Sequence, residues 1–164
     1  MTDAFLSLGS NLGDRQAHLE KALERLVKSG VAIRKASRIY ETVPVEVQGV
    51  QDNYLNMVVE VEYEGEAMDL LDRCQEVESA LGRARPYVHA PRTIDIDILL
   101  IRGVALMNER LVVPHPRLED RAFVIHPLAE IAPGLILPSG RTAGQVKKTF
   151  GNDEIVSIRE YAYG

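Results

Sequence analysis

Two aspartates, Asp95 and Asp97, stand in the middle of the apolar run from Thr93 to Ile101. Aspartate is depleted in strands, and strand side chains alternate, so both carboxylates point to one face about 6.5–7 Å apart. Carboxylates this close repel each other unless a cation lies between them. A hard cation that prefers oxygen, such as Mg²⁺ or Mn²⁺, fits such a pair. The pattern predicts a metal site; the alternative is a pair of surface acids facing basic residues on the next strand.

Arginines surround this pair in the sequence. Residues 83–121 contain seven Arg, no Lys and five acidic residues, a local excess of two positive charges. The planar guanidinium fits phosphate through two hydrogen bonds, and phosphoryl transfer depends on positioning and on neutralising the charge of the moving group. The sequence therefore predicts phosphoryl transfer, against the alternative of an Arg-rich solvated surface. The basic residues concerned are Arg83, Arg85, Arg92, His115, Arg117 and Arg121.

Tyr54, Asn56 and Phe123 form a second candidate group. Only 5% of the residues are aromatic and Trp is absent. Aromatic rings can stack a flat heterocycle while an amide binds its polar edge. This group predicts a heterocycle pocket; ordinary core packing is the alternative.

Other features carry less chemistry. The segment Gly9–Asp14 follows an expected strand and opens a helix, which is where a phosphate loop would lie, but it has no P-loop lysine, so we expect a structural turn. Cys74 falls on the apolar stripe of a helix and is expected in the core. A single Cys also excludes an intramolecular disulfide and disfavours a four-ligand zinc site. His115, held between Pro114 and Pro116, could donate to phosphate.

The elements expected to position these residues follow the order β-α-β-β-α-β up to residue 101. That order predicts an α+β, ferredoxin-like antiparallel sheet with two helices on one face and the other face free. The expected strands are 4–8, 31–42, 54–63 and 93–101. The expected helices are the one that follows Gly13, with an apolar stripe from Leu19 to Val27, and 66–81. A small hairpin (105–113), short C-terminal helices (123–131 and 140–150) and an edge strand (155–158) follow, and 43–53 and 83–92 are expected to be loops.

Chain length and net charge limit the number of domains and the kinds of partner that the protein is expected to have. The 164 residues suit a single domain over 1–164. A net charge of −5 and a pI near 5.4 disfavour a nucleic-acid partner. No apolar run approaches the ~20 residues of a bilayer span, and no secretory signal is evident. We therefore expect no membrane partner and a cytoplasmic location.

Taken together, these residues resemble the 6-hydroxymethyl-7,8-dihydropterin pyrophosphokinase family over nearly the whole chain. The core Pro91-Arg92-x-x-Asp95-x-Asp97 is specific, and further matching stretches flank it in order. The matching stretches are Leu8–Asp14, Tyr54–Asn56, Ala90–Leu99, Val113–Arg117, Arg121–Val124 and Pro127–Pro133.

The resemblance implies a reaction in which ATP and hydroxymethyl-dihydropterin give AMP and the pterin diphosphate. Asp95 and Asp97 would hold two Mg²⁺ ions, and Arg83 and Arg92 would stabilise charge on the transferred group. The implied ATP site comprises Gln75, Glu78, Arg83, Arg85, Arg92, Ile98, His115 and Arg121. The implied pterin site comprises Thr42, Val45, Tyr54, Asn56, Asp95 and Phe123, with the loops 43–53 and 83–92 closing over the substrates. A monomer is expected on the same ground.

The chain departs from the family in two places. Some members have a Trp preceded by a basic residue shortly before the Pro-Arg pair, whereas this chain has Tyr87–Ala90 in a stretch one residue shorter, so either Tyr87 or His89 would cover the nucleotide. Pro116 stands where some members have a Tyr. Two other functions remain open: a palm-type nucleotidyl transferase or cyclase, which would release pyrophosphate, and a regulatory module that binds a small molecule without turnover.

Overall fold

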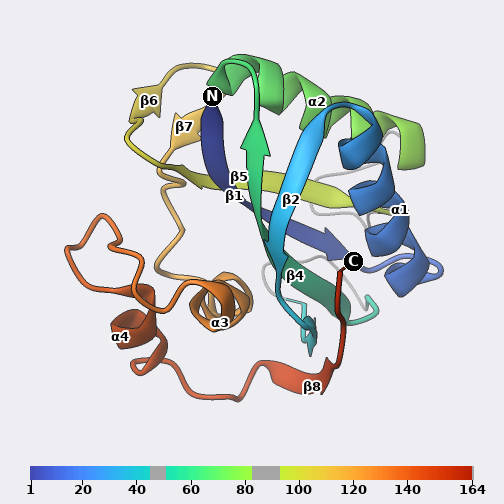
Figure 1. The fold of residues 1–164 in the computed structure, drawn as a ribbon. Helices are drawn as coiled ribbons and strands as arrows, with labels where there is room; N and C mark the ends of the chain where they lie inside the picture. The colour runs from blue at the N-terminus through green and yellow to red at the C-terminus, as the bar shows by residue number, and fades with distance from the viewer. Residues whose placement is uncertain (45–50, 83–92, 164) are drawn as a thin grey trace.

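The computed structural model describes residues 1–44, 51–82 and 93–163, which form an antiparallel sheet with helices on both faces (Figure 1). The strands are β1 (Thr2–Ser10), β2 (Val31–Ala36), β3 (Ile39–Thr42), β4 (Tyr54–Tyr63), β5 (Asp95–Ile101), β6 (Leu106–Met107), β7 (Val112–Val113) and β8 (Ile155–Arg159). The helices are α1 (Arg15–Lys28), α2 (Ala67–Leu81), α3 (Ala122–Ile131) and α4 (Ala143–Lys147).

The main sheet has the strand order β5-β1-β4-β3-β8, and β2 also pairs with β4. The strands β2 and β3 lie along the same edge of β4, so together they take the place of the single strand expected over 31–42. The interruption falls at Ser37, whose hydroxyl accepts a hydrogen bond from the Val58 amide at 3.0 Å. This order is that of a ferredoxin-like sheet, and the expected α+β class is confirmed.

The helices α1 and α2 cover one face of the sheet (Figure 1). Asp14 caps α1 by accepting a hydrogen bond from the Ala17 amide at 3.1 Å. Leu19 and Leu26 are buried as expected, but Val27 is 42% exposed, because eight helical residues after Leu19 correspond to a rotation of about 80° away from it. Cys74 is fully buried in α2, as expected, and burial raises the pKa of its thiol to about 12.

The expectation that the second face of the sheet would be free is wrong over part of that face. Phe5 and Val58 point to this face and are fully buried, because α3 and α4 pack over them in a second apolar cluster. Burying large apolar side chains of this kind stabilises the fold by roughly 1.5–3 kcal/mol each. Figure 1 shows α3 and α4 on the opposite side of the sheet from α1 and α2.

The remaining elements follow the sequence prediction closely. The hairpin of β6 and β7 and the edge strand β8, which pairs with β3, are present. Some boundaries differ: β1 begins at Thr2 and continues through Gly9 and Ser10, which were expected in a turn, β5 begins at Asp95, and α4 is limited to Ala143–Lys147. Over residues 1–44, 51–82 and 93–163, no helix has the length and apolar character needed to cross a bilayer.

Candidate active site

The two groups singled out in the sequence lie on the same face of the sheet, at its polar end. The register pairs Gly9 with Asp95 on one side and with Asn56 on the other. Asn56 in turn pairs with Tyr40 on β3. Directly paired residues point to the same face, so a single row of side chains runs from Asp95 across Gly9 to Asn56 and Tyr40. The two ends of the Asp95–Asn56 span lie about 10 Å apart, which is two strand spacings.

Gly9 keeps the centre of this row open. A Cβ atom at Gly9 would lie 2.8 Å from Oδ1 of Asn56 and 3.5 Å from a ring carbon of Tyr54. The first of these distances is too short for real atoms, so any other residue would displace the Asn56 amide. The sequence marked Gly9 only as part of a turn; its role as a spacer depends on the strand register, which a single sequence does not reveal.

Asn56 is held firmly on this face. It is only 3% exposed, and its amide nitrogen donates to the Thr42 hydroxyl at 2.6 Å. This bond commits the nitrogen of the amide to Thr42 and turns its oxygen toward Gly9. Tyr54 lies two residues before Asn56 and opposite Thr42 in the register, so these three residues form one patch.

Asp95 and Asp97 are partly exposed on β5, whereas Ile96 and Ile98 are buried against α1 and α2. The alternation predicted from the sequence is therefore present. Asp97 pairs with Ser7 on β1, so the neighbour directly opposite it is not basic. This observation disfavours the alternative of surface acids facing basic residues on the next strand.

Glu78 adds a third carboxylate beside this pair. It reaches from α2 to the outer edge of β5, where it accepts a hydrogen bond from the Ile96 amide at 2.8 Å. Burial, with a smaller contribution from the negative charges of Asp95 and Asp97, raises the pKa of Glu78 to about 7, and the hydrogen bond from the Ile96 amide opposes this shift. The three acids therefore form a region of concentrated negative charge. Among the described residues, no group of three or more His, Cys, Asp or Glu side chains is arranged to hold a metal ion.

His115 borders the acidic pair from the loop after β7. Its amide donates to the Leu99 carbonyl on β5 at 2.7 Å, and its Nδ1 accepts from the Arg117 amide at 3.1 Å. Burial lowers the pKa of His115, Arg121 and Arg117 lower it further, and Asp95 opposes them. Because Nδ1 accepts a hydrogen bond from the Arg117 amide, Nε2 is the ring nitrogen that presents an N–H donor.

Phe123 and Arg121 lie at the start of α3. The Arg121 guanidinium carbon is 5.5 Å from the centre of the Phe123 ring, a cation–π geometry. Phe123 is partly buried against the second apolar cluster. Core packing, the alternative for this residue, therefore accounts for part of the ring surface, and the rest of the ring is partly exposed.

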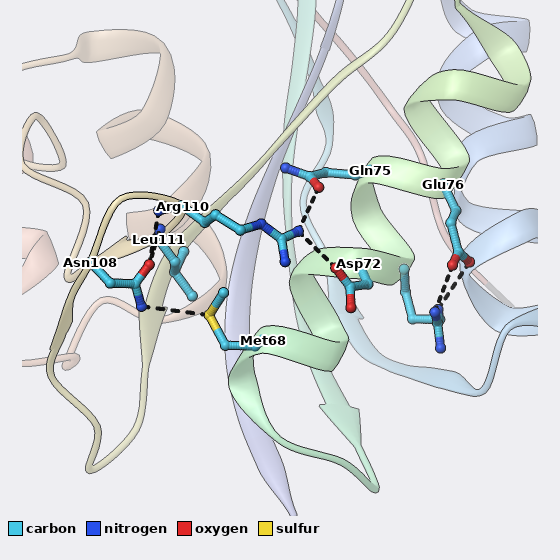
Figure 2. Close-up of polar contacts among 8 residues, drawn as sticks. Met68, Asp72, Gln75, Glu76, Asn108, Arg110 and Leu111 are labelled. Atoms are coloured by element: carbon cyan, nitrogen blue, oxygen red, sulfur yellow. Dashed lines mark hydrogen bonds and ion pairs between the residues drawn. The ribbon is translucent and has the colours of Figure 1, made fainter.

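Gln75, on the exposed side of α2, is joined to the hairpin by Arg110 (Figure 2). The Nη2 atom of Arg110 donates to Gln75 Oε1 at 2.8 Å and to Asp72 at 2.7 Å. Asn108 and Met68 make a second contact between the hairpin and the same helix at 3.7 Å. Arg110 was not singled out from the sequence, although it belongs to the Arg-rich window, because its position opposite α2 depends on the hairpin.

Several expected site residues lie outside the described part of the chain. These residues are Val45, Arg83, Arg85 and Arg92, together with the two candidates for covering the nucleotide, Tyr87 and His89. Of the described residues next to these ranges, Gln51 accepts a hydrogen bond from Asn11 just after β1, and Thr93 lies shortly before Asp95 at the start of β5. Ile98 is buried on the helix-covered face of β5, so its side chain does not point toward the acidic pair.

The fold and the polar face define an α+β protein with a carboxylate pair, a histidine and an aromatic patch on one ferredoxin-like sheet. Residues 5–133 match the model of the family described as 7,8-dihydro-6-hydroxymethylpterin-pyrophosphokinase (HPPK). The chain belongs to this family.

Relatives with curated names agree with this assignment. The chain is 44% identical over 129 residues to the 2-amino-4-hydroxy-6-hydroxymethyldihydropteridine pyrophosphokinase of Bacillus subtilis, covering 78% of this chain and 77% of that one. It is 35% identical over 159 residues to the enzyme of the same name from Haemophilus influenzae, covering 96% and 99% of the two chains.

Solved structures agree on the fold. A crystallised HPPK-DHPS chain in complex with substrates superposes with a TM-score of 0.71 at 13% identity, covering 91% of this chain and 45% of that chain. The Plasmodium falciparum HPPK-DHPS gives a TM-score of 0.66 at 14% identity, covering 91% and 43%. The chain thus spans less than half the length of these solved chains, and the likeness concerns the fold alone.

Proposed function

We propose that this protein is a pyrophosphokinase of folate biosynthesis. It transfers the pyrophosphoryl group of ATP to the hydroxymethyl oxygen of 6-hydroxymethyl-7,8-dihydropterin, and the products are AMP and the pterin diphosphate. Its family membership supports this activity. In the structure, the proposal depends on the row of side chains from Asp95 across Gly9 to Asn56. In this row, carboxylates that could bind metal and phosphate lie next to residues that could bind a heterocycle.

The pterin is proposed to lie over Gly9, between Tyr54 and Phe123. Both rings border this face, and stacking of a heterocycle on an aromatic side chain contributes roughly 1–3 kcal/mol. The Asn56 oxygen, held by the bond to Thr42, would accept from an N–H group on the pterin edge. The hydroxymethyl group would then point along the row toward Asp95. The backbone near Val45 is proposed to complete this pocket.

The donor set at the acidic end fits Mg²⁺. Mg²⁺ is commonly bound through one or two carboxylates and completes its shell with water and substrate phosphates. Asp95 and Asp97 supply two such carboxylates, and their negative charges add to burial in raising the pKa of Glu78 beside them. We propose that the pair holds two Mg²⁺ ions together with the ATP phosphates. When bound, the ions would polarise the phosphoryl oxygens and neutralise developing charge.

The chain's own residues would align the reacting groups. Asp95 lies nearest the proposed pterin hydroxyl, so it is placed to orient that hydroxyl toward the β-phosphorus of ATP. Near-attack positioning of this kind can lower a barrier by several kcal/mol. His115 would donate from Nε2 to a phosphate oxygen, and Arg121 would add positive charge beside it. Arg83 and Arg92 are proposed to stabilise charge on the transferred group.

The nucleoside of ATP is proposed to lie along α2 and the hairpin. Gln75 and Glu78 are proposed to border this region together with the backbone of Ile98, whose side chain is buried, and Arg85 is proposed to join them. The Arg110 bond to Gln75 holds the hairpin against α2 and so supports a preformed nucleoside pocket. We further propose that residues 1–164 act as one catalytic domain and as a monomer. A cytoplasmic location is proposed because ATP is a cytoplasmic substrate.

Product analysis tests the proposal. The purified protein is incubated with ATP, Mg²⁺ and 6-hydroxymethyl-7,8-dihydropterin, and AMP, ADP, pyrophosphate and pterin products are quantified. AMP formed one-for-one with pterin diphosphate is the expected result. ADP would indicate transfer of a single phosphoryl group, and pyrophosphate would indicate the nucleotidyl transferase alternative. Tight binding of pterin without any turnover would favour the regulatory module.

A further inference from the structure

Glu130, in the last turn of α3, joins this helix to β3 through a single carboxylate. Its Oε2 accepts from the backbone amide of Arg38 at 3.0 Å, and its Oε1 accepts from the Tyr40 hydroxyl at 2.6 Å. The Arg38 side chain adds a longer contact to Oε1 at 3.3 Å. Both oxygens are therefore bonded to β3 or to the residue directly before it. The hydroxyl contact is short, as expected for a charge-assisted bond.

The partner of this carboxylate belongs to the pterin patch of β3 and β4. Tyr40 is 2% exposed and lies directly opposite Asn56 in the register. Its neighbour on the same face of β3, Thr42, receives the Asn56 hydrogen bond. Burial and the bond to Glu130 both raise the pKa of Tyr40, so its hydroxyl stays protonated as a donor.

The other end of α3 carries Phe123. Glu130 follows Phe123 by seven residues, which is about two helical turns, so both side chains lie on the same face of α3. Pro127 lies between them, inside the helix. Because proline has no N–H group, the Phe123 carbonyl lacks its i→i+4 hydrogen bond. The first turn of α3 is therefore held less by the helix itself and more by tertiary contacts.

A purely structural role is the competing explanation. The Arg38 side chain is 38% exposed and also lies 3.5 Å from Glu160. Exposed ion pairs of this kind contribute little to the stability of the fold. The Tyr40 hydroxyl and the Arg38 amide differ from that pair because they are less exposed and have fixed geometry. A structural role would lower stability and affect both substrates alike.

We infer that Glu130 and Tyr40 are positioning residues of the pterin site: their hydrogen bond fixes the distance between Phe123 on α3 and Asn56 on β4. This inference rests on the proposed function, since it concerns the same pocket. It predicts a specific coupling. Loss of the Tyr40–Glu130 bond would let α3 shift relative to the sheet. The Phe123 ring would then no longer stack on the pterin while Asn56 binds the pterin edge.

The test is a double-mutant cycle on pterin affinity. Tyr40→Phe removes one hydroxyl and keeps the ring, and Tyr63→Phe is the matched control at the far end of β4. We expect Tyr40→Phe to raise the pterin Kd about five- to tenfold, the size of one lost hydrogen bond, with the ATP Kd changed less than about twofold. In a Phe123→Ala background, Tyr40→Phe should have almost no further effect, because the two residues act through one contact.

Glu130 provides a second series. Glu130→Gln keeps acceptor oxygen and should fall between wild type and Glu130→Ala in pterin affinity. If Glu130→Ala does not fold, Tyr40→Phe still decides the question. A wild-type protein that binds no pterin would overturn the proposed function. Wild-type binding with a Tyr40→Phe Kd equal to that of Tyr63→Phe, or with effects that add fully to Phe123→Ala, would overturn the positioning role alone.

Discussion

At the scale of single residues, the proposed site has carboxylates at the Asp95 end of the row of side chains and the pterin-binding residues at the Asn56 end. Asp97 faces the open side of β5 and is only partly buried, so its carboxylate contributes little to the core. Its energetic importance is expected to lie in catalysis. Residues of this kind can be changed without loss of the fold.

Asp97→Ala should lower kcat by at least about a hundredfold while the protein stays folded. Removal of one preorganised electrostatic contact to a transition state typically costs that much. Steady-state kinetics in saturating Mg²⁺ and a thermal melt measure the two quantities. Asp153→Ala, an exposed position in the C-terminal segment, is the control. Activity within tenfold of wild type in excess Mg²⁺ would exclude Asp97 as a metal ligand.

Phe123→Ala should weaken pterin binding about tenfold or more and ATP binding by less than threefold. The reason is the loss of a stacking contact worth roughly 1–3 kcal/mol. Calorimetric titration of each ligand provides the comparison. Phe150→Ala removes another ring that packs against the same apolar cluster and controls for general loosening. Equal losses for both ligands would assign Phe123 to packing.

At the scale of elements, the strand register is what brings the two groups together. Gly9 lies between Asp95 and Asn56 only because β1 is the strand between β5 and β4. A β-α-β-β-α-β chain places its first strand in this position, so the arrangement follows from the order of elements. The glycine then keeps the space above β1 clear.

Gly9→Ala should raise the pterin Kd about tenfold. The new Cβ would lie 2.8 Å from the Asn56 oxygen, and relieving such a contact typically costs 1–3 kcal/mol. Gly134→Ala, where nothing lies within 4 Å of the added carbon, is the matched control. Pterin titrations of both variants give the answer. A Kd for Gly9→Ala equal to that of Gly134→Ala would show that the pterin does not lie over this strand.

Much of this arrangement could be predicted from the sequence. The alternation of Asp95 and Asp97 with buried isoleucines identified both the strand and its two faces, and Tyr54–Tyr63 was predicted with its observed bounds. The cover of α3 over the second face was missed, because periodicity shows that a helix is amphipathic but not which surface it packs on. Arg110, Tyr40 and Glu130 were missed for a similar reason: each acts through a partner at least 35 residues away in the sequence.

At the scale of the whole molecule, the concentration of acids at one edge has a cost in stability. Glu78 has its pKa raised to about 7 by burial and by the charges of Asp95 and Asp97. Between its ordinary pKa and this value the folded protein binds a proton that the unfolded chain does not. The free energy of unfolding therefore falls as pH rises through this window.

Glu78→Gln should remove this pH dependence in metal-free buffer. The amide oxygen can still accept from the Ile96 amide, but the side chain no longer ionises. The stability of the variant relative to wild type should rise by on the order of 2–3 kcal/mol from pH 5 to pH 8. Urea unfolding across this range measures it, with Glu20→Gln on the exposed side of α1 as control. A pH-independent difference would mean that Glu78 does not titrate in this window.

At this same scale, the proposed mechanism requires metal-bound ATP phosphates to meet the pterin on the polar end of the second sheet face. The most direct measurement is anomalous diffraction from crystals grown with Mn²⁺, a non-hydrolysable ATP analogue and the pterin. We expect manganese peaks bound by both Asp95 and Asp97, with the pterin ring over Gly9 between Tyr54 and Phe123. Manganese bound elsewhere, or a pterin on the face covered by α1 and α2, would contradict it.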